Sequence, residues 1–348
     1  MSKIIIAIIV VCCVHQVIGQ TLNSPESIDF HTPTNTWYIS NSNSILAMDS
    51  QGNLSTFTTN VTSTYGIEVV NDFVYVLDSR SVKVFSLSSG SLERIVTIPG
   101  AGFLNGITFD GTQYVWFTDF STGKVWKLDI TTYLPSLVVT YIGQSPNGIY
   151  YDQSNDMVYV VGFTSNASVY SINPNTAAVT TLITTTQSSF DGITKGCDGN
   201  FYVSAWGSQS LLKFDENFSS APTVVMSGLS SPSDIYFNAS TNQVAIPNSG
   251  NNSISYHDVD CDPVGTTQKN TSFSPQIYPT LISNLINIKG LKSSSTLKIH
   301  AADGKLIITK IITDDTQIDV SVLAPGTYFA SIRSIVTNEL TTQTLIKN

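Results

Sequence analysis

One short pattern occurs six times along the chain, and this repeat constrains the fold more than any other feature. Each copy centres on an isoleucine preceded by two residues, most often a polar residue and a glycine. The six isoleucines are Ile28, Ile67, Ile107, Ile149, Ile193 and Ile235, so successive copies lie 39, 40, 42, 44 and 42 residues apart. A fixed period near 40 residues is typical of propellers and related repeat architectures.

The residues after each isoleucine predict four short β-strands per copy. In the third copy a polar turn follows the first strand, then come a β-rich run (Val115–Phe117) and an alternating run (Lys124–Asp129). Such β-branched and aromatic runs, separated by Gly, Asn, Asp and Ser, carry no helical period. Four strands per repeat form one propeller blade. We therefore expect an all-β chain in which residues 20–261 form a six-bladed β-propeller. A β-sandwich is the alternative, but it would not repeat one first-strand signature six times.

The sixth copy shows no obvious fourth strand before Cys261. Residues near Gln20 to Asn23 are the candidates to supply a strand that closes the ring.

Residues 1–19 have the pattern of a secretory signal peptide. Lys3 precedes an almost wholly apolar run from Ile4 to Val14, and Gly19 is a small residue at the expected cleavage site before Gln20. The alternative, a membrane anchor, needs about 20 apolar residues to span a bilayer. No later stretch is long and apolar enough to span one, so we expect a secreted or cell-surface protein that passes through the periplasm.

Two cysteines stay in the mature chain, Cys197 and Cys261. Disulfides persist outside the cytosol, so the pair is a candidate disulfide. Two free thiols in neighbouring loops are the alternative.

The composition changes after Cys261. Residues 262–275 are polar and rich in turn-forming residues, as in a linker. Residues 276–348 contain six short alternating runs, with Asp303-Gly304 as a hairpin signal between two of them. This C-terminal segment predicts a small antiparallel β-sandwich.

Several landmarks of the last segment resemble the type A C-terminal sorting domain of the type IX secretion system. They are Tyr278-Pro279, Ile286-Asn287-Ile288, Asp303-Gly304-Lys305, Ile318-Asp319-Val320, Leu323, Gly326-Thr327-Tyr328-Phe329 and Ile346-Lys347. The chain departs from that family at Thr280, where Asn-Pro usually follows. The resemblance implies a Bacteroidota source, contact with the type IX secretion machinery, transport across the outer membrane and removal of the sorting domain.

The residue two places before each isoleucine should lie at one mouth of the propeller channel, because the innermost strand of every blade lines that channel. These residues are Glu26, Tyr65, Asn105, Asn147, Asp191 and Ser233. Two carboxylates and two amide carbonyls offer oxygen ligands to one central point. Calcium takes 6–8 such ligands, whereas manganese, magnesium and zinc are further candidates.

Turn chemistry is the competing explanation, because Asn-Gly and Asp-Gly are common turn dipeptides. Positive φ angles would then explain Gly66, Gly106, Gly148 and Gly192 without any ion. Glycine explains only the residue directly before the isoleucine, however. Turn propensity does not favour Glu26, which lies two residues before Ile28.

The segments at Glu26, Asn105, Asn147 and Asp191 also resemble the metal-site segments of the gluconolactonase and senescence-marker-protein family. That resemblance covers about residues 24–261 and implies a divalent cation in the channel with lactone hydrolase activity. It makes these four residues the metal ligands and Asp191 the general base that activates water. Tyr65, Ser233, Phe120 and Trp206 would line the pocket. Phe120, Phe163 and Trp206 belong to loops between second and third strands on the same mouth and would form an apolar wall, with packing between blades as the alternative for Phe163.

The charge balance limits the partners. Lys and Arg number 16 against 25 Asp and Glu, so the net charge is −9 and nucleic acid is not an expected ligand. His31, His257 and His300 are scattered, which argues against a serine–histidine–aspartate triad.

Two functions stay open: a secreted metal-dependent lactone or ester hydrolase, and a non-catalytic propeller that binds a glycan, a peptide or a surface partner.

Overall fold

The computed structural model describes residues 20–261, 275–291, 294–302, 305–334 and 340–347. The expected signal peptide and residues 262–274 of the expected linker lie outside this range. The chain divides into two compact units, residues 1–263 and 264–348.

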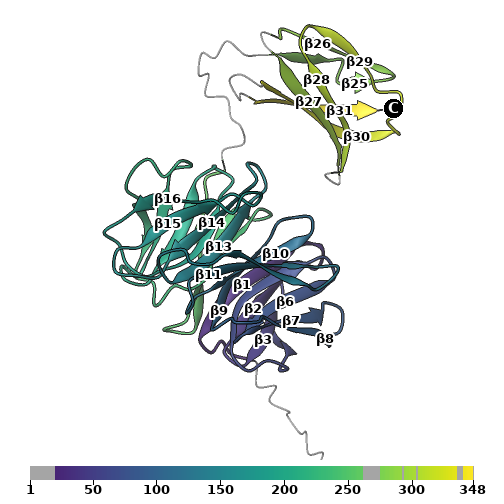
Figure 1. Cartoon of the computed structure of the whole chain (residues 1–348). Helices are drawn as coiled ribbons and strands as arrows, with labels where there is room; N and C mark the ends of the chain where they lie inside the picture. Colours follow the sequence, from purple (N-terminus) through teal and green to yellow (C-terminus); the bar gives the residue numbers. More distant parts are fainter. Residues whose placement is uncertain (1–19, 262–274, 292–293, 303–304, 335–339, 348) are drawn as a thin grey trace, which may run out of the picture. The chain divides into compact units, whose positions relative to one another are not determined.

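The first unit consists of consecutive antiparallel sheets, each built from strands that follow one another in the chain (Figure 1). Blade 1 contains β1 (Pro25–His31), β2 (Thr36–Asn41), β3 (Ser44–Met48) and β4 (Leu54–Thr58), with a short 3-10 turn η1 (Thr32–Thr34). Blade 2 contains β5 (Thr64–Val70), β6 (Phe73–Asp78), β7 (Ser81–Ser86) and β8 (Leu92–Thr97). Blade 3 contains β9 (Leu104–Phe109), β10 (Tyr114–Asp119), β11 (Lys124–Asp129) and β12 (Pro135–Val139).

Blade 4 contains β13 (Pro146–Asp152), β14 (Met157–Gly162), β15 (Ser168–Ile172) and β16 (Val179–Thr184). Blade 5 contains β17 (Phe190–Lys195), β18 (Phe201–Ala205), β19 (Ser210–Phe214) and β20 (Thr223–Ser227). Within the described residues, blade 6 has three strands, β21 (Tyr236–Asn238), β22 (Gln243–Asn248) and β23 (Ser253–Asp258). The predicted six-bladed propeller is confirmed.

The core of the propeller lies between blades. Leu77 and Val84 of blade 2 pack with Leu104 and Phe117 of blade 3, and each of these four side chains is fully buried. Equivalent clusters fill every other pair of neighbouring blades. A blade has two apolar faces, so it buries both only when it stands between two neighbours.

The ring closes by side-chain packing and single hydrogen bonds. Ala245 of blade 6 belongs to the same cluster as Ile39 and Leu46 of blade 1. Gln20 to Asn23, the candidates for a closing strand, form no strand. Blade 6 therefore ends at the free edge of β23 among the residues that are described.

The second unit, taken by itself, contains two sheets. The first sheet has the order β24 (Gln276–Tyr278), β26 (Leu285–Lys289), β29 (Thr316–Asp319), and the second has the order β25 (Leu281–Ile282), β31 (Leu340–Lys347), β30 (Gly326–Ser334), β27 (Ser295–Ala301), β28 (Leu306–Ile312). Ile286 and Ile288 of the first sheet and Leu297 and Ile332 of the second share one core. The six expected strands are present, and the sequence missed β24 and β25, which have three and two residues. All pairings are antiparallel except that of β25 with β31.

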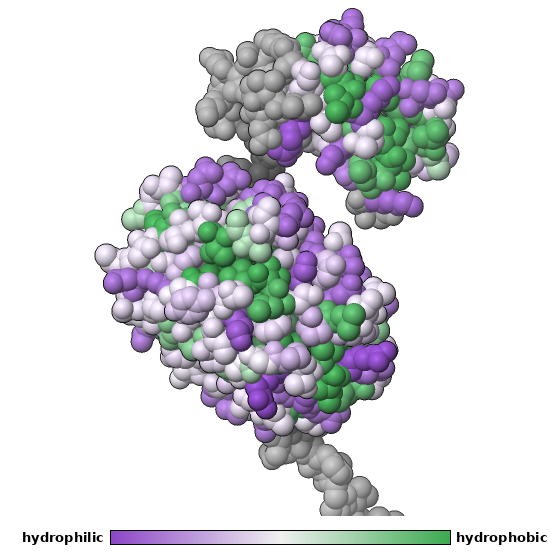
Figure 2. Space-filling model, viewed as in Figure 1, coloured by the Kyte–Doolittle hydropathy of each residue, from purple (hydrophilic) through white to green (hydrophobic). Residues whose placement is uncertain are grey.

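Residues of intermediate hydropathy cover much of the propeller face seen in Figure 2, as expected for a chain with only 12% charged residues. Apolar areas on that face are separate and interrupted by polar residues.

Candidate functional site

Five of the six candidate residues of the channel mouth lie inside β-bulges near the beginning of the inner strands, and the sixth, Ser233, precedes β21. In blade 4, three steps along β13 from Pro146 to Ile149 oppose only two steps along β14, so Asn147 and Gly148 contain the extra residue. The same shift occurs between Pro25 and Ile28, between Thr64 and Ile67, and between Phe190 and Ile193. A bulge bends its strand and redirects side chains, which explains how these positions leave the regular alternation of the strand.

Hydroxyl groups on the second strands hold the bulges of neighbouring blades. Thr118 of β10 donates a hydrogen bond to the carbonyl of Asn147 over 2.7 Å and accepts one from the N–H of Gly106 over 2.9 Å. Ser204 of β18 does the same for the carbonyl of Ser233 and the N–H of Gly192. Each hydroxyl thus fixes its own bulge to that of the next blade.

Close approach between blades explains the glycines of the bulges. A Cβ on Gly106 would clash with the backbone oxygen of Asn147, and one on Gly148 would clash with the backbone oxygen of Asp191. None of these glycines has a positive φ. Positive φ angles are therefore the wrong explanation for them: the inner strands come so close here that only glycine fits.

Three of the four metal-ligand candidates are buried at this level of the channel, and Glu26 is partly exposed. Asn105, Asn147 and Asp191 are 6%, 2% and 2% exposed. Neither the Oδ1 atom of Asn147 nor the Oδ1 atom of Asp191 has a hydrogen-bond partner. Glu26 accepts a hydrogen bond from the Ser233 hydroxyl over 3.2 Å. A buried acceptor without a partner is uncommon in folded proteins, so two of them on adjacent blades mark an unusual place.

The two carboxyl groups of the mouth influence each other. Burial raises the pKa of Asp191 well above its usual range, and the nearby carboxyls of Glu26 and Asp234 raise it further. The side chains of Asn147 and Trp206 act in the opposite direction on the same pKa. Burial also raises the pKa of Glu26 to about 7, against the hydrogen bond from Ser233. The structure thus brings Glu26, Asn147 and Asp191 into one group, with Asn105 at the equivalent position of blade 3.

A metal site here depends on amide oxygens. Among the described residues, no group of three or more His, Cys, Asp or Glu side chains is arranged to hold a metal ion. The candidate set contains only two carboxylates, so Asn105 and Asn147 would supply the remaining side-chain ligands.

A row of five aromatic rings, which we call the aromatic belt, runs across blades 2 to 5. Its members are Tyr65, Phe103, Phe120, Phe163 and Trp206. Successive ring centres lie 4.4, 5.7, 5.7 and 5.7 Å apart, and every contact is edge-to-face. All five side chains are partly exposed. The sequence pointed to four of these residues and missed Phe103, which precedes β9 and lies outside the loops between second and third strands.

The channel also contains a cavity of about 370 Å³, which was not expected from the sequence. The six anchor isoleucines line it together with Glu68, Asp234, Tyr150 and Tyr236. Burial raises the pKa of Asp234 to about 7, and it raises the pKa of Glu68 well above its usual range. In the sequence, the residue directly after each repeated isoleucine could have indicated this cavity. These residues are Asp29, Glu68, Thr108, Tyr150, Thr194 and Tyr236.

The position after the isoleucine joins neighbouring blades through hydrogen bonds. The Asp29 carboxylate accepts from the N–H of Val69, and the Glu68 carboxylate accepts from the N–H of Phe109 over 3.0 Å. Thr108 accepts from the N–H of Tyr151 in the same way. These side chains therefore have a structural role between blades.

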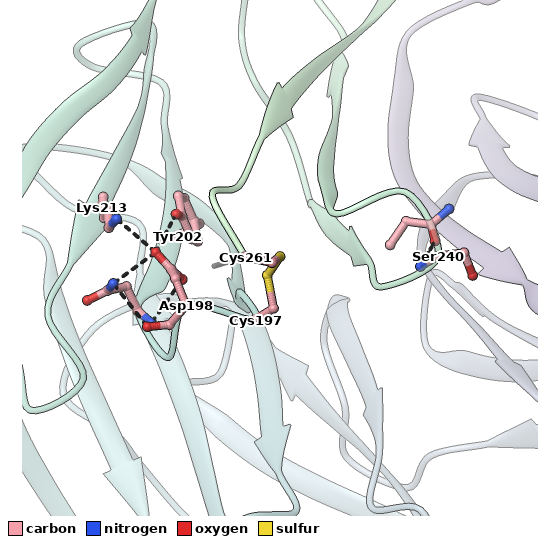
Figure 3. Close-up of a disulfide and its surroundings, with 8 residues drawn as sticks. Cys197, Asp198, Tyr202, Lys213, Ser240 and Cys261 are labelled. Atoms are coloured by element: carbon pink, nitrogen blue, oxygen red, sulfur yellow. Dashed lines mark hydrogen bonds and ion pairs between the residues drawn. A yellow bond between two sulfur atoms is a disulfide. The ribbon is translucent and has the colours of Figure 1, made fainter. Parts of the chain in front are cut away.

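Cys197 and Cys261 form a disulfide, with their Cα atoms 5.3 Å apart (Figure 3). Cys197 lies in the turn between β17 and β18 of blade 5, and Cys261 follows β23 of blade 6. Beside the bond, Asp198 forms an ion pair with Lys213 and accepts a hydrogen bond from the Tyr202 hydroxyl. The disulfide thus attaches the end of the incomplete blade to its neighbour.

Comparison with known families identifies the C-terminal segment. Residues 276–348 match the family described as secretion system C-terminal sorting domain. This match confirms the resemblance seen in the sequence and shows a chain exported by type IX secretion to the cell surface or the extracellular space. No helix among the described residues is long and apolar enough to cross a membrane. No curated protein matches the chain in sequence.

Several solved structures are similar to the chain in fold. A luciferin-regenerating enzyme shares 13% identity and a TM-score of 0.54, over 67% of this chain and 85% of that one. An inactive virginiamycin B lyase from Staphylococcus aureus with quinupristin shares 16% identity and a TM-score of 0.52, over 77% and 94%. A nidogen/laminin complex shares 14% identity and a TM-score of 0.53, over 64% and 93%. At such low identity these likenesses show the fold alone.

Proposed function

We propose that this exported propeller holds a divalent cation, calcium foremost, at the channel mouth and hydrolyses a lactone or an ester there. Glu26, Asn105, Asn147 and Asp191 would hold the ion. The observation that carries the proposal is the pair of buried oxygen atoms, Asn147 Oδ1 and Asp191 Oδ1, that have no hydrogen-bond partner.

The charges at the mouth support a cation. Two carboxyl groups, Glu26 and Asp191, share a buried site, and no Lys or Arg among the described residues forms an ion pair with either. Converging carboxylates repel each other, so one takes a proton unless a cation compensates the charge. A divalent ion balances two carboxylates, and calcium accepts a mixed set of carboxylate, amide and water oxygens.

A bound cation would supply electrophilic assistance to a carbonyl group of the substrate. The residues of the chain then have defined tasks. Asp191 accepts a proton from water as the water oxygen attacks the carbonyl carbon, and it returns that proton to the leaving alkoxide when the acyl C–O bond breaks. The products are a carboxylic acid and an alcohol.

A non-catalytic propeller that binds a glycan, a peptide or a surface partner is the second candidate. The partly exposed aromatic belt favours it, because aromatic rings are common at binding surfaces. The similar structures described above include a nidogen/laminin complex as well as enzymes, and the loops of one propeller scaffold serve many functions.

Cation binding is tested by titration calorimetry on the chelator-treated propeller with calcium, manganese, magnesium and zinc, together with element analysis of the untreated protein. We expect one ion per chain and lost affinity in Asp191→Asn, which keeps the size of the side chain. The matched control is Glu68→Gln, a half-buried channel carboxyl outside the mouth whose hydrogen bond from Phe109 an amide oxygen can also accept.

The catalytic part is tested with a panel of lactones and esters in the presence of the ion that binds. Hydrolysis that disappears in Asp191→Asn but persists in Glu68→Gln is the expected result. An ion without any hydrolysis would favour the binding propeller, and a mouth that takes up no cation would end the metal proposal.

A further inference from the structure

We propose that the mouth selects an uncharged ligand with an aromatic ring next to a carbonyl group, and that the indole N–H of Trp206 donates a hydrogen bond to that carbonyl oxygen. This inference rests on the proposed function for the site, because it defines the lactone or ester that the mouth would accept.

The aromatic belt supplies the surface for the ring. Its five members come from four consecutive blades, yet each ring touches the next, so the belt is continuous across loops far apart in sequence. The belt residues are partly exposed, whereas large aromatic core residues such as Trp116 and Phe117 are at most 1% exposed. A connected, accessible aromatic surface favours a planar apolar ligand, because aromatic rings prefer edge-to-face and offset contacts with one another.

Trp206 also presents a polar group that the fold leaves unused. Its Nε1 atom is buried and has no hydrogen-bond partner. The indole N–H nevertheless lies near enough to Asp191 to lower the pKa of that carboxyl. The hydroxyl of Thr164, next to Phe163 in the belt, is likewise buried without a partner. Buried donors without partners are rare in native proteins and call for a specific reason.

A ligand oxygen at the mouth that accepts a hydrogen bond from Trp206 explains why this buried donor has no partner in the protein. Trp206 joins the two parts of the site, because its ring ends the aromatic belt and its indole lies close to the carboxyl group of Asp191, the proposed base. A carbonyl oxygen held by this donor would place the attached ring against Phe163 and Phe120 and the carbonyl carbon next to Asp191.

The charge of the site indicates an uncharged ligand. Glu26 and Asp191 repel a carboxylate or phosphate, and no basic residue within the described part of the chain pairs with either of them. With a divalent cation in place the two negative charges are compensated, which leaves no net charge to attract an anion. Polyhydroxylated acids would in addition lose water at the apolar belt without gaining partners there.

The test uses probes that cannot be hydrolysed, so that binding is separated from turnover. The first probe is 3,4-dihydroquinolin-2-one, a lactam with an aromatic ring and a carbonyl group. The second is tetralin, which has a similar shape and no hydrogen-bond acceptor. Affinity for both is measured by calorimetry with calcium present, on the wild type and on Trp206→Phe. The matched control is Trp126→Phe, since Trp126 Nε1 also lacks a partner but belongs to the core between blades 2 and 3.

We expect Trp206→Phe to weaken lactam binding about 10-fold, the equivalent of one neutral hydrogen bond, and to leave tetralin binding within about twofold. Trp126→Phe should leave lactam binding unchanged. Equal loss for both probes would show that only ring contact was removed and would overturn the role of the N–H. Unchanged lactam affinity in Trp206→Phe would overturn the whole inference.

Turnover of dihydrocoumarin and of glucono-δ-lactone distinguishes this inference from the proposed function. Trp206→Phe should raise KM for dihydrocoumarin and also lower kcat, because a carbonyl oxygen gains negative charge in the transition state. If no substrate is hydrolysed but lactam binding depends on Trp206, the hydrolase proposal fails and the binding inference stands. If the sugar lactone is preferred and Trp206→Phe has no effect, the hydrolase proposal stands and this inference fails.

Discussion

The backbone N–H of Asp234 in blade 6 donates a hydrogen bond to the carbonyl oxygen of Glu26 in blade 1, over 2.9 Å. This bond joins the last blade to the first, where no strand is shared. It also brings two acidic residues of the channel next to each other, and the Asp234 carboxyl raises the pKa of Glu26. The closure of the ring and the electrostatics of the mouth therefore depend on the same contact.

The disulfide should stabilise the propeller, because blade 6 has no outer strand within the described residues and the bond attaches its end to blade 5. Replacing both Cys197 and Cys261 by serine is expected to lower the free energy of unfolding by about 2–4 kcal/mol. Denaturant unfolding of the oxidised wild type and the double variant measures this. The wild type under reducing conditions is the control and should behave like the double variant. Equal stability of all three would mean that blade 6 is held without the bond.

Calcium should raise the melting temperature of the propeller. A ligand at 100 times its Kd adds about 2.7 kcal/mol to the native state, which corresponds to roughly 5–10 °C for a domain of this size. Differential scanning calorimetry with calcium and with chelator measures the shift. Asp191→Asn should lose it and Glu68→Gln should keep it. A shift of equal size in both variants would place the cation elsewhere.

Without a cation, raising the pH should destabilise the propeller through Asp234. Burial raises the pKa of this carboxyl from 3.8 to about 7, so the native state binds the proton more tightly than the unfolded chain does. The free energy of unfolding therefore falls as the pH rises from about 4 to about 7 and changes little above that. Carboxyls with lowered pKa, such as Asp119, act in the opposite direction at lower pH.

Asp234→Asn isolates this contribution. The asparagine oxygen can still accept from the N–H of Ile235, and the Ser27 hydroxyl can turn to accept from the new amide. In chelator, the melting temperature of the variant minus that of the wild type should increase by several degrees between pH 5 and pH 8. Asp260→Asn on the exposed surface is the control and should show no trend. A difference that is constant with pH would contradict the assignment.

The glycines of the bulges, Gly66, Gly106, Gly148 and Gly192, should tolerate no side chain. Gly148→Ala places a Cβ against the backbone of Asp191 and Gly192, which cannot move without disturbing blade 5. We expect a loss of about 1–3 kcal/mol in stability, as for other overpacked sites, together with weaker cation binding. Gly162→Ala is the control, because its Cβ would mainly meet the flexible side chain of Gln144. Equal tolerance of both changes would show that the inner strands have room to separate.

The sequence determined the class of fold and the composition of the mouth. The spacing of six isoleucines fixed the number of blades, because each blade must place one inner strand on the channel and that strand needs the same local chemistry. The position two residues before Ile149 or Ile193 is equivalent in every blade, so Asn147 and Asp191 were found together without coordinates. The landmarks around Gly326 and Tyr328 identified the sorting domain in the same direct way.

Only the tertiary structure decided what depends on contacts between blades. The role of Gly148 followed from its distance to the next strand, which no local pattern contains. Phe103 joined the aromatic belt because its loop meets Phe120 and Tyr65 in space, and the carboxyls of Glu26, Asp191 and Asp234 became neighbours only when the ring closed. Burial and proximity between residues about 200 positions apart set the pKa values of these groups. A linear sequence specifies which groups are present, whereas the environment that changes their chemistry exists only after folding.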